Sequence, residues 1–176
     1  MSADNAAVVR RAVAEDAAAL ALVASATFLD AFAGILNGRD IVAHCAQNNT
    51  PARFADWLGD PASVVTLAET GHGAAPLGYS VLTTPDLPIE TAPGDVELKR
   101  IYLLSRLHGS GLGAELMARA LADARALGKS RMLLGVYGGN ARARAFYERQ
   151  GFAVVGARRF LVGETWHDDA VYARAL

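Results

Sequence analysis

The stretch HGSGLG, residues 108–113, joins a β-like segment to an amphipathic helix and is the strongest indication of the fold in this sequence. Residues 96–104 before it form the β-like segment, and residues 112–127 carry apolar side chains at helical spacing up to Gly128. Three glycines at alternate positions let the backbone turn tightly and expose its N–H groups. Together with the helix dipole, those groups form a site suited to an anion such as a pyrophosphate.

Two better-known glycine-rich loops do not fit this stretch. A Walker loop is excluded, because no Lys-Ser or Lys-Thr pair closes it. A dinucleotide site of the Rossmann type fits poorly, because the strand comes late in the chain and the following strand ends at Tyr137 without an acidic residue for a ribose. Cys45 is the only cysteine, which excludes internal disulfides and cysteine-cluster zinc sites. No metal-ligand spacing links the histidines, so no metal is expected.

A second stretch, NARARAFYERQGF at residues 140–152, begins with an N-cap asparagine and ends on a Gly-Phe exit. Between them the Phe146-Tyr147 pair lies on the expected helix. An aromatic pair on an amphipathic helix is also compatible with a purely structural role in the core.

The order of elements predicts an α+β fold with a mostly antiparallel sheet and one parallel βαβ step, in a single domain spanning residues 1–176. No separate core-forming stretch follows a clean break, so the proline-containing residues 84–94 are expected to be a loop. The expected strands are 8–13, 63–69, 77–83, 96–104, 132–137, 152–162 and 169–176, and the expected helices are 15–33, 40–47, 51–58, 112–127 and 141–150.

The apolar pattern changes phase inside residues 96–104. Val96 and Leu98 share one face of a strand, whereas Ile101 and Leu103 fall on the opposite parity. This change predicts a β-bulge near residues 99–100. The alternative is a strand that is buried on both faces.

Taken together, the glycine loop and the Asn…Phe-Tyr stretch resemble the GNAT superfamily of acyl-CoA N-acyltransferases. Residues 97–103 resemble the bulged fourth strand of that family, which splays away from the fifth. Residues 133–137 are similar to the fifth strand of a bacterial subgroup that includes polyamine acetyltransferases. The resemblance implies an acetyl-CoA-dependent N-acetyltransferase, in which a primary amine attacks the thioester directly. A catalytically weak acyl-CoA-binding or sensing module is the alternative.

The resemblance also implies roles for individual residues. Tyr147 would act as the general acid near the thioester sulfur, and Glu97 matches the position where some members carry a general base. The family loop usually opens with Arg or Gln, and His108 at that position makes coenzyme A binding weaker or sensitive to pH. The residues expected to contact the cofactor are Ile101, Tyr102, Leu103, His108, Gly109, Ser110, Gly111, Leu112, Gly113, Ala114, Asn140, Ala143, Phe146 and Tyr147.

Composition points to an ordinary globular protein. The chain has 176 residues, of which 52% are hydrophobic and 20% charged, and this composition excludes a disordered or fibrous protein. The N-terminus lacks a secretory pattern, and the apolar residues 17–29 are too few to span a bilayer, so a cytoplasmic protein without a membrane partner is expected. A nucleic-acid partner is not expected, because the basic residues are not interleaved with exposed aromatics.

Charge is unevenly distributed along the chain. Residues 1–95 hold 11 acidic and 4 basic side chains, and residues 96–176 hold 7 acidic and 13 basic ones. An acidic first half favours a cationic acceptor, namely a polyamine, an aminoglycoside-like amine or a basic peptide N-terminus. Simple scatter over the folded surface is the alternative. Trp166 near the last turn is a candidate for acceptor contact or for a homodimer interface. The carboxylates expected to attract the acceptor are Asp30, Asp40, Asp56, Asp86, Glu90 and Asp95.

Overall fold

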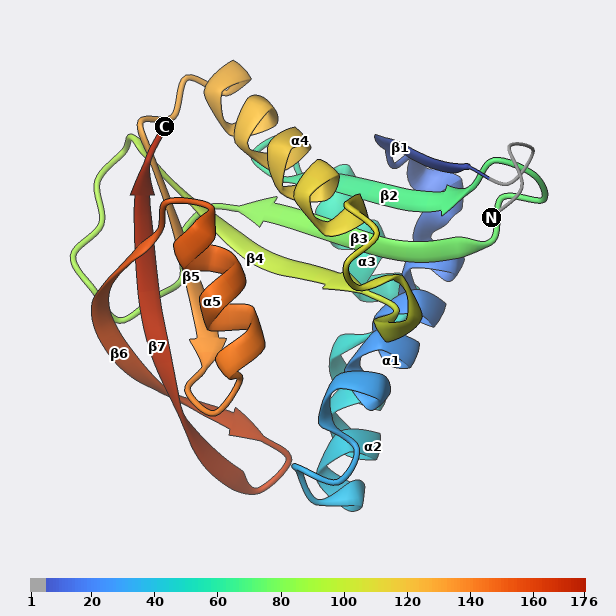
Figure 1. The fold of residues 1–176 in the computed structure, drawn as a ribbon, viewed down its shortest axis with the longest axis horizontal. Coiled ribbons are helices and arrows are strands. Elements are labelled where there is room, and N and C mark those ends of the chain that lie inside the picture. The colour runs from blue at the N-terminus through green and yellow to red at the C-terminus, as the bar shows by residue number, and fades with distance from the viewer. Residues whose placement is uncertain (1–5) are drawn as a thin grey trace.

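The computed structural model describes residues 6–176 and contains a seven-stranded sheet in the order β1-β2-β3-β4-β5-β7-β6. In Figure 1, α4 and α5 lie on the near face of the sheet, and α1 and α3 lie behind it. The strands are β1 (Ala7–Arg11), β2 (Val64–Thr70), β3 (Pro76–Thr83), β4 (Asp95–Leu103), β5 (Arg131–Tyr137), β6 (Ala153–Val162) and β7 (Thr165–Ala175). The helices are α1 (Ala17–Phe32), α2 (Gly38–Asn48), α3 (Pro51–Gly59), α4 (Leu112–Ala126) and α5 (Ala141–Arg149).

One pair of strands is parallel. β4 and β5 pair only from Asp95–Arg131 to Glu97–Leu133, and beyond that point they diverge, as Figure 1 shows. All other neighbouring strands are antiparallel. The predicted α+β fold with one parallel step and a splayed strand is therefore confirmed.

The predicted bulge lies in β4. Its register against β3 shifts from Val81–Arg100 to Leu82–Leu98, which leaves Lys99 as the extra residue. The bulge restores the phase of the strand, so that Leu98 and Ile101 both pack into the core beneath α4.

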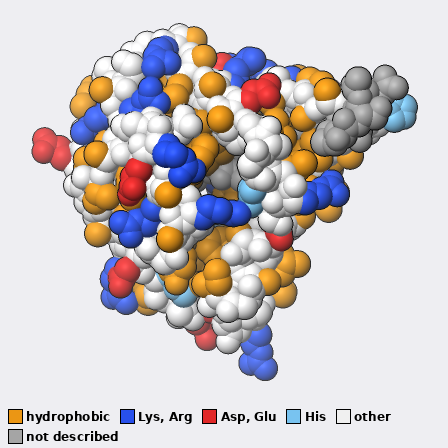
Figure 2. All heavy atoms as spheres, in the orientation of Figure 1, with side chains coloured by type: hydrophobic (Ala, Val, Ile, Leu, Met, Phe, Trp, Pro, Cys, Tyr) orange, Lys and Arg blue, Asp and Glu red, His pale blue; other side chains and the backbone are white. Residues whose placement is uncertain are grey.

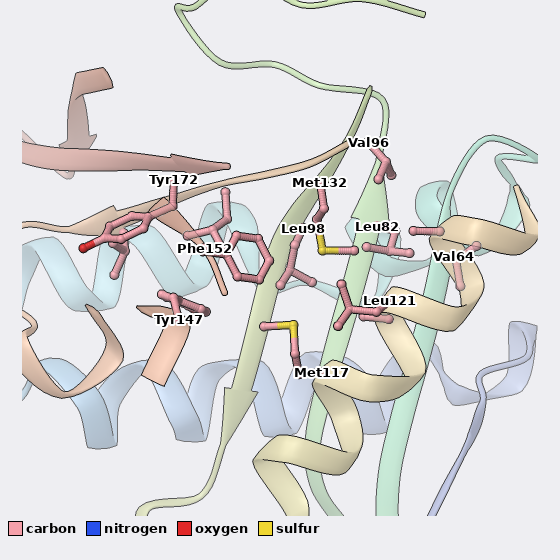
Figure 3. Close-up of a cluster of buried hydrophobic side chains, with 14 residues drawn as sticks. Val64, Leu82, Val96, Leu98, Met117, Leu121, Met132, Tyr147, Phe152 and Tyr172 are labelled. Atoms are coloured by element: carbon pink, nitrogen blue, oxygen red, sulfur yellow. The ribbon is translucent and has the colours of Figure 1, made fainter. Parts of the chain in front are cut away.

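Two apolar clusters hold helices on opposite faces of the sheet. Figure 3 shows the cluster on the α4 side, where Met117 and Leu121 point from α4 toward the sheet and Tyr147 from α5 lies close to Phe152. The other cluster packs Leu20 of α1 and Phe54 of α3 against β2 and β3. Among residues 6–176, no helix combines the length and the apolarity needed to cross a bilayer.

The second strand of the last hairpin begins four residues earlier than its sequence predicts. β7 starts at Thr165 rather than at residue 169, so the turn contains only Gly163 and Glu164. Gly163 takes a positive φ of 59°, which suits such a tight turn. Asp40 of α2 accepts hydrogen bonds from the Glu164 N–H at 3.3 Å and the Thr165 hydroxyl at 2.7 Å. These hydrogen bonds hold the polar first residues of β7 in the strand. The alternation of apolar and polar residues in the sequence does not predict this part of the strand.

The orientation of α1 can be tested with Leu20 and Leu22, which are two residues apart and point to opposite sides of the helix. Leu20 is 0% exposed, whereas Leu22 is 65% exposed. We expect Leu20→Ala to lower the free energy of unfolding by about 2–5 kcal/mol, because it leaves a cavity between α1 and the sheet. Leu22→Ala is the matched control and should change that free energy by less than about 0.5 kcal/mol. Urea unfolding of both variants measures the difference, and equal losses would contradict the described packing.

Candidate active site

A cavity of about 1110 Å³ runs through the opening between β4 and β5. On the α4 side its wall includes Gly109, Gly113 and Asn140, and on the α1 side it includes Phe28 and His44. Figure 2 shows the α4 side of the molecule, where Lys and Arg side chains border a hollow near the centre. The splay therefore connects two chambers on opposite faces of one sheet.

The glycine loop has the backbone geometry of an anion cradle. Gly109 and Gly111 take φ values of 83° and 92°, in the left-handed region that favours glycine. Gly111 is the N-cap of α4, so the first-turn N–H groups of Gly113 and Ala114 have no helical carbonyl to reach. Within the loop, the Ser110 N–H donates to the Leu107 carbonyl at 3.2 Å and the Leu112 N–H donates to the Ser110 hydroxyl at 3.4 Å. The free amides and the dipole of a 15-residue helix suit a phosphate group.

His108 joins this loop to α5. Its Nε2 lies 3.1 Å from the Leu103 carbonyl oxygen, and its Nδ1 contacts the Arg142 guanidinium. A neutral ring that donates from Nε2 and accepts at Nδ1 satisfies both contacts. Burial and the nearby Arg142 charge lower the pKa of His108, which favours that neutral form. His108 thus orients Arg142, which lines the cavity, and leaves Arg142 to supply the positive charge.

Beyond Glu97, the described residues form no further ladder pair between β4 and β5, so Ile101 and Leu103 lie along a strand edge where only the His108 ring contacts the Leu103 carbonyl. Such an edge offers backbone N–H and C=O groups to an extended ligand. Tyr102 points to the opposite face of the sheet from Ile101 and stacks on Tyr79 with ring centroids 6.0 Å apart.

Helix α5 and its N-cap contribute four of the expected residues, and all four line the cavity: Asn140, Ala143, Phe146 and Tyr147. Asn140 caps the helix by accepting the Ala143 N–H at 3.0 Å, which leaves its side-chain NH₂ group for a ligand. Phe146 lies against the start of α4, since a Cβ on Gly113 would be 3.9 Å from its ring. Tyr147 lines the cavity but is only 9% exposed, and burial raises the pKa of its hydroxyl. Its phenol is therefore protonated at neutral pH.

Glu97 is 1% exposed and lies outside the cavity lining. Its carboxylate accepts the Asp86 N–H at 2.7 Å and pairs with Lys99 at 3.4 Å. Both partners do line the cavity. Glu97 thus supports the wall near the bulge instead of facing the open space.

A different carboxylate does face the cavity. Asp169 on β7 is buried, lines the chamber on the α1 side, and pairs with Arg158 at 3.1 Å. Burial raises the pKa of Asp169, even though Arg158 opposes the shift. The Arg158 guanidinium lies directly over Gly135 of β5, where a Cβ would come within 2.6 Å of it. Sequence reasoning missed this pair because it assigned Asp169 to the first position of the last strand, whereas the true register pairs Arg158 with Asp169.

The carboxylates expected to attract a cationic acceptor are mostly engaged elsewhere. Asp40 holds the last hairpin, and Asp95 forms a salt bridge with Arg131 at 2.6 Å. Asp56 and Glu90 lie outside the cavity lining. Only Asp30 and Asp86 reach the cavity, and Asp30 accepts the Ser105 N–H at 2.8 Å. The acidic first half of the sequence therefore does not produce an acidic chamber. Trp166 also lies outside the cavity lining, on the exposed hairpin.

Within residues 6–176, no group of three or more His, Cys, Asp or Glu side chains is arranged to hold a metal ion.

Comparison with known proteins identifies relatives across almost the whole chain. The profile of the acetyltransferase (GNAT) family matches residues 30–152. An uncharacterised N-acetyltransferase of Mycobacterium tuberculosis (strain ATCC 25618 / H37Rv) is 37% identical over 161 residues, which are 92% of this chain and 98% of that protein. Residues 30–152 include the glycine loop, both splayed strands and all of α5.

Two solved structures share the fold. The PaiA N-acetyltransferase from Thermoplasma acidophilum, in complex with coenzyme A, has a TM-score of 0.78 at 18% identity and covers 97% of this chain and 99% of its own. The ribosomal-protein-alanine N-acetyltransferase from Brucella melitensis has a TM-score of 0.67 at 24% identity, with coverage of 96% and 99%.

Gly111→Ala tests the anion cradle. A Cβ at Gly111 meets no atom within 4 Å, so only the left-handed backbone is strained, at a cost of about 1–2 kcal/mol. We expect a loss of that size in the free energy of unfolding and weaker coenzyme A binding, measured by denaturation and calorimetry. Gly59→Ala is the control, because its Cβ also meets open space but its φ is not positive. If Gly111→Ala binds coenzyme A with unchanged affinity, the inference that this loop contacts coenzyme A is wrong.

Proposed function

This chain belongs to the GNAT family of acetyltransferases, and we propose on that basis that it transfers the acetyl group of acetyl-CoA to a small primary amine or a peptide N-terminus. The observation that carries this proposal is the single cavity that passes through the β4–β5 splay. An acetyl donor on the α4 side and an amine on the α1 side would meet in that opening. Because one sheet bounds both chambers, we propose that residues 1–176 work as one catalytic domain.

We propose that the α4 side of the cavity binds acetyl-CoA. The pyrophosphate would rest on the amides from Gly109 to Ala114, with the Arg142 charge beside them. The pantetheine arm would pair with the free β4 edge at Ile101 and Leu103, with Tyr102 between them on the other face. The amides of Gly113 and Ala114 and the β4 edge at Ile101 support this assignment, because among the described residues they have no internal partner that the ligand would have to displace. At Leu103 the carbonyl already contacts the His108 ring. The residues proposed to flank the arm are Asn140, Ala143 and Phe146, whereas His108, Ser110 and Leu112 belong to the loop proposed to hold the pyrophosphate.

When bound, acetyl-CoA supplies a thioester whose carbonyl carbon forms a bond to the amine nitrogen as the carbon–sulfur bond breaks. We propose that the Tyr147 hydroxyl gives its proton to the departing sulfur. Its position in the cavity supports this role, and because burial raises the pKa of the hydroxyl, the phenol carries a proton to give at neutral pH.

The amine must lose a proton, and a carboxylate beside the chamber is suited to take it. We propose Asp169 for this role, because it lines the cavity and burial raises the pKa of its carboxyl group. Glu97, which family resemblance suggests as the base, is proposed instead to position Lys99 and the loop at Asp86.

Thiol release from acetyl-CoA in the presence of amines tests the transfer. Wild-type protein should release thiol only when both substrates are present. Tyr147→Phe keeps the ring but removes the proton donor, so turnover should fall by roughly 10²- to 10⁴-fold while acetyl-CoA affinity changes little. Binding of acetyl-CoA without thiol release across a broad amine panel would identify a sensing module instead.

The two carboxylates can be separated by the pH dependence of kcat/KM. A base must be deprotonated, so activity should fall as pH drops through the raised pKa of Asp169. Asp169→Asn keeps an acceptor for the Arg158 N–H, and it should lose roughly 10²- to 10⁴-fold in kcat/KM together with that acid limb. Glu97→Gln is the matched variant and should keep the limb. Loss of the limb in Glu97→Gln alone would reassign the base.

A further inference from the structure

Arg100 is a cation without a counter-ion in the α1-side chamber. It enters from β4 next to the bulge, is half-buried and lines the cavity. Two other cations of this chamber are already paired, Lys99 with Glu97 and Arg158 with Asp169. Among residues 6–176, no carboxylate forms a salt bridge with Arg100.

Neutral groups hold the Arg100 guanidinium in a fixed position. It donates to the Asn49 side-chain oxygen at 2.7 Å and to the Asn48 carbonyl at 3.2 Å. It also lies 4.9 Å from the Trp57 ring centroid and 5.9 Å from that of Phe54. A partly buried charge is costly unless an anion neutralises it, and these contacts orient the charge without neutralising it.

A second, independent feature points into the same cavity. The Thr83 side chain is 8% exposed and lines the cavity, yet its buried hydroxyl has no hydrogen-bond partner among the described residues. Thr83 lies two positions along β3 from Val81, the residue paired with Arg100, and therefore on the same face of the sheet. Buried hydroxyls normally find a partner, so this one lacks an acceptor. An anionic oxygen would satisfy both groups.

The rest of the chamber wall adds positive charge and apolar surface. Arg53 lies 5.9 Å from the Trp57 ring centroid and forms no salt bridge in the described part of the chain. His44 stays neutral, because burial and then the Arg100 charge lower its pKa to about 4. Phe28 and Phe160 lie beside His44, with ring centroids 4.2 and 6.2 Å from it, and Phe32 packs in the same cluster. The chamber wall thus combines cationic groups with aromatic surface.

We propose that the acceptor amine also carries a carboxylate, which Arg100 and Thr83 bind while an apolar part of the acceptor rests on the aromatic wall. This inference rests on the proposed acetyl transfer and specifies its substrate class. Because Arg100 adjoins Ile101 on the free edge of β4, a carboxylate held there keeps the acceptor beside the opening through which the acetyl group would pass. A polyamine has no group for Arg100 and is repelled by it.

Matched acceptors that differ only in the carboxylate test this inference. The pairs are phenylalanine with phenethylamine, and lysine with cadaverine. With acetyl-CoA saturating, kcat/KM for thiol release should be roughly 10- to 100-fold higher for the amino acid of a pair, the range expected for hydrogen bonds to a charged group. The aromatic pair should show the higher absolute values, because its ring matches the wall.

Arg100→Gln should reduce that ratio by roughly tenfold or more, because glutamine keeps hydrogen-bonding capacity but removes the charge. Arg39→Gln is the matched control, since Arg39 is exposed on α2 and lies outside the cavity lining. In this variant, kcat/KM for both acceptors of a pair should stay at the wild-type value. Competition by 3-phenylpropanoate, which has the carboxylate but no amine, provides a readout on the wild-type protein. It should raise the apparent KM for phenylalanine without lowering kcat.

The outcomes distinguish failure of the carboxylate subsite from failure of the proposed acetyl transfer. Thiol release with equal or better kcat/KM for the decarboxylated amines overturns the carboxylate subsite and leaves acetyl transfer standing. Absence of thiol release with every amine overturns the transfer itself. A preference for the amino acids that survives in a folded Arg100→Gln variant removes Arg100 from the subsite.

Discussion

The active site depends on the early end of β4–β5 pairing. Three residue pairs hold the two strands together, and then the ladder stops. The bulge at Lys99 changes the course of β4 at that point and keeps Leu98 and Ile101 in the core under α4. A regular strand would either close the opening or turn Ile101 out of the core. One extra residue therefore creates a passage through the sheet while the apolar packing on both faces stays intact.

The passage separates two electrostatic environments. On the α4 side, positive charge comes from backbone amides, the helix dipole and Arg142, all of which suit phosphate groups. On the α1 side, Lys99 and Arg158 are paired with carboxylates, whereas Arg100 and Arg53 form no salt bridge with any described residue. Counting charges along the chain predicts an acidic chamber on this side, but folding engages Asp40 and Asp95 in structural contacts. Local pairing, and not the total charge of a segment, determines what a chamber attracts.

Much of the fold and of the cofactor side could be predicted from sequence, because short-range rules govern them. Periodicity located the strands, the phase change located the bulge, and glycine with N-cap chemistry located the starts of α4 and α5. The acceptor side is made by residues that meet only through long-range pairing. Arg158 faces Asp169 because the hairpin turns at residues 163–164, and Arg100 meets Asn49 because α2 ends beneath β4. No local sequence pattern predicts either of these two contacts.

Gly135 has a consequence for how this chain can diverge over evolutionary time. Its missing side chain is the space in which the Arg158 guanidinium rests, since a Cβ there would lie 2.6 Å from the Arg158 carbon that joins its nitrogens. The two positions are therefore coupled: in a lineage that keeps the arginine, a side chain at position 135 makes the guanidinium shift and disturbs its pairing with Asp169. A lineage that replaces the arginine by a short residue can accept a larger side chain at position 135. That side chain would narrow the passage from its β5 side. Substrate range in such descendants would shift through paired replacements, with either single change passing through a less fit intermediate.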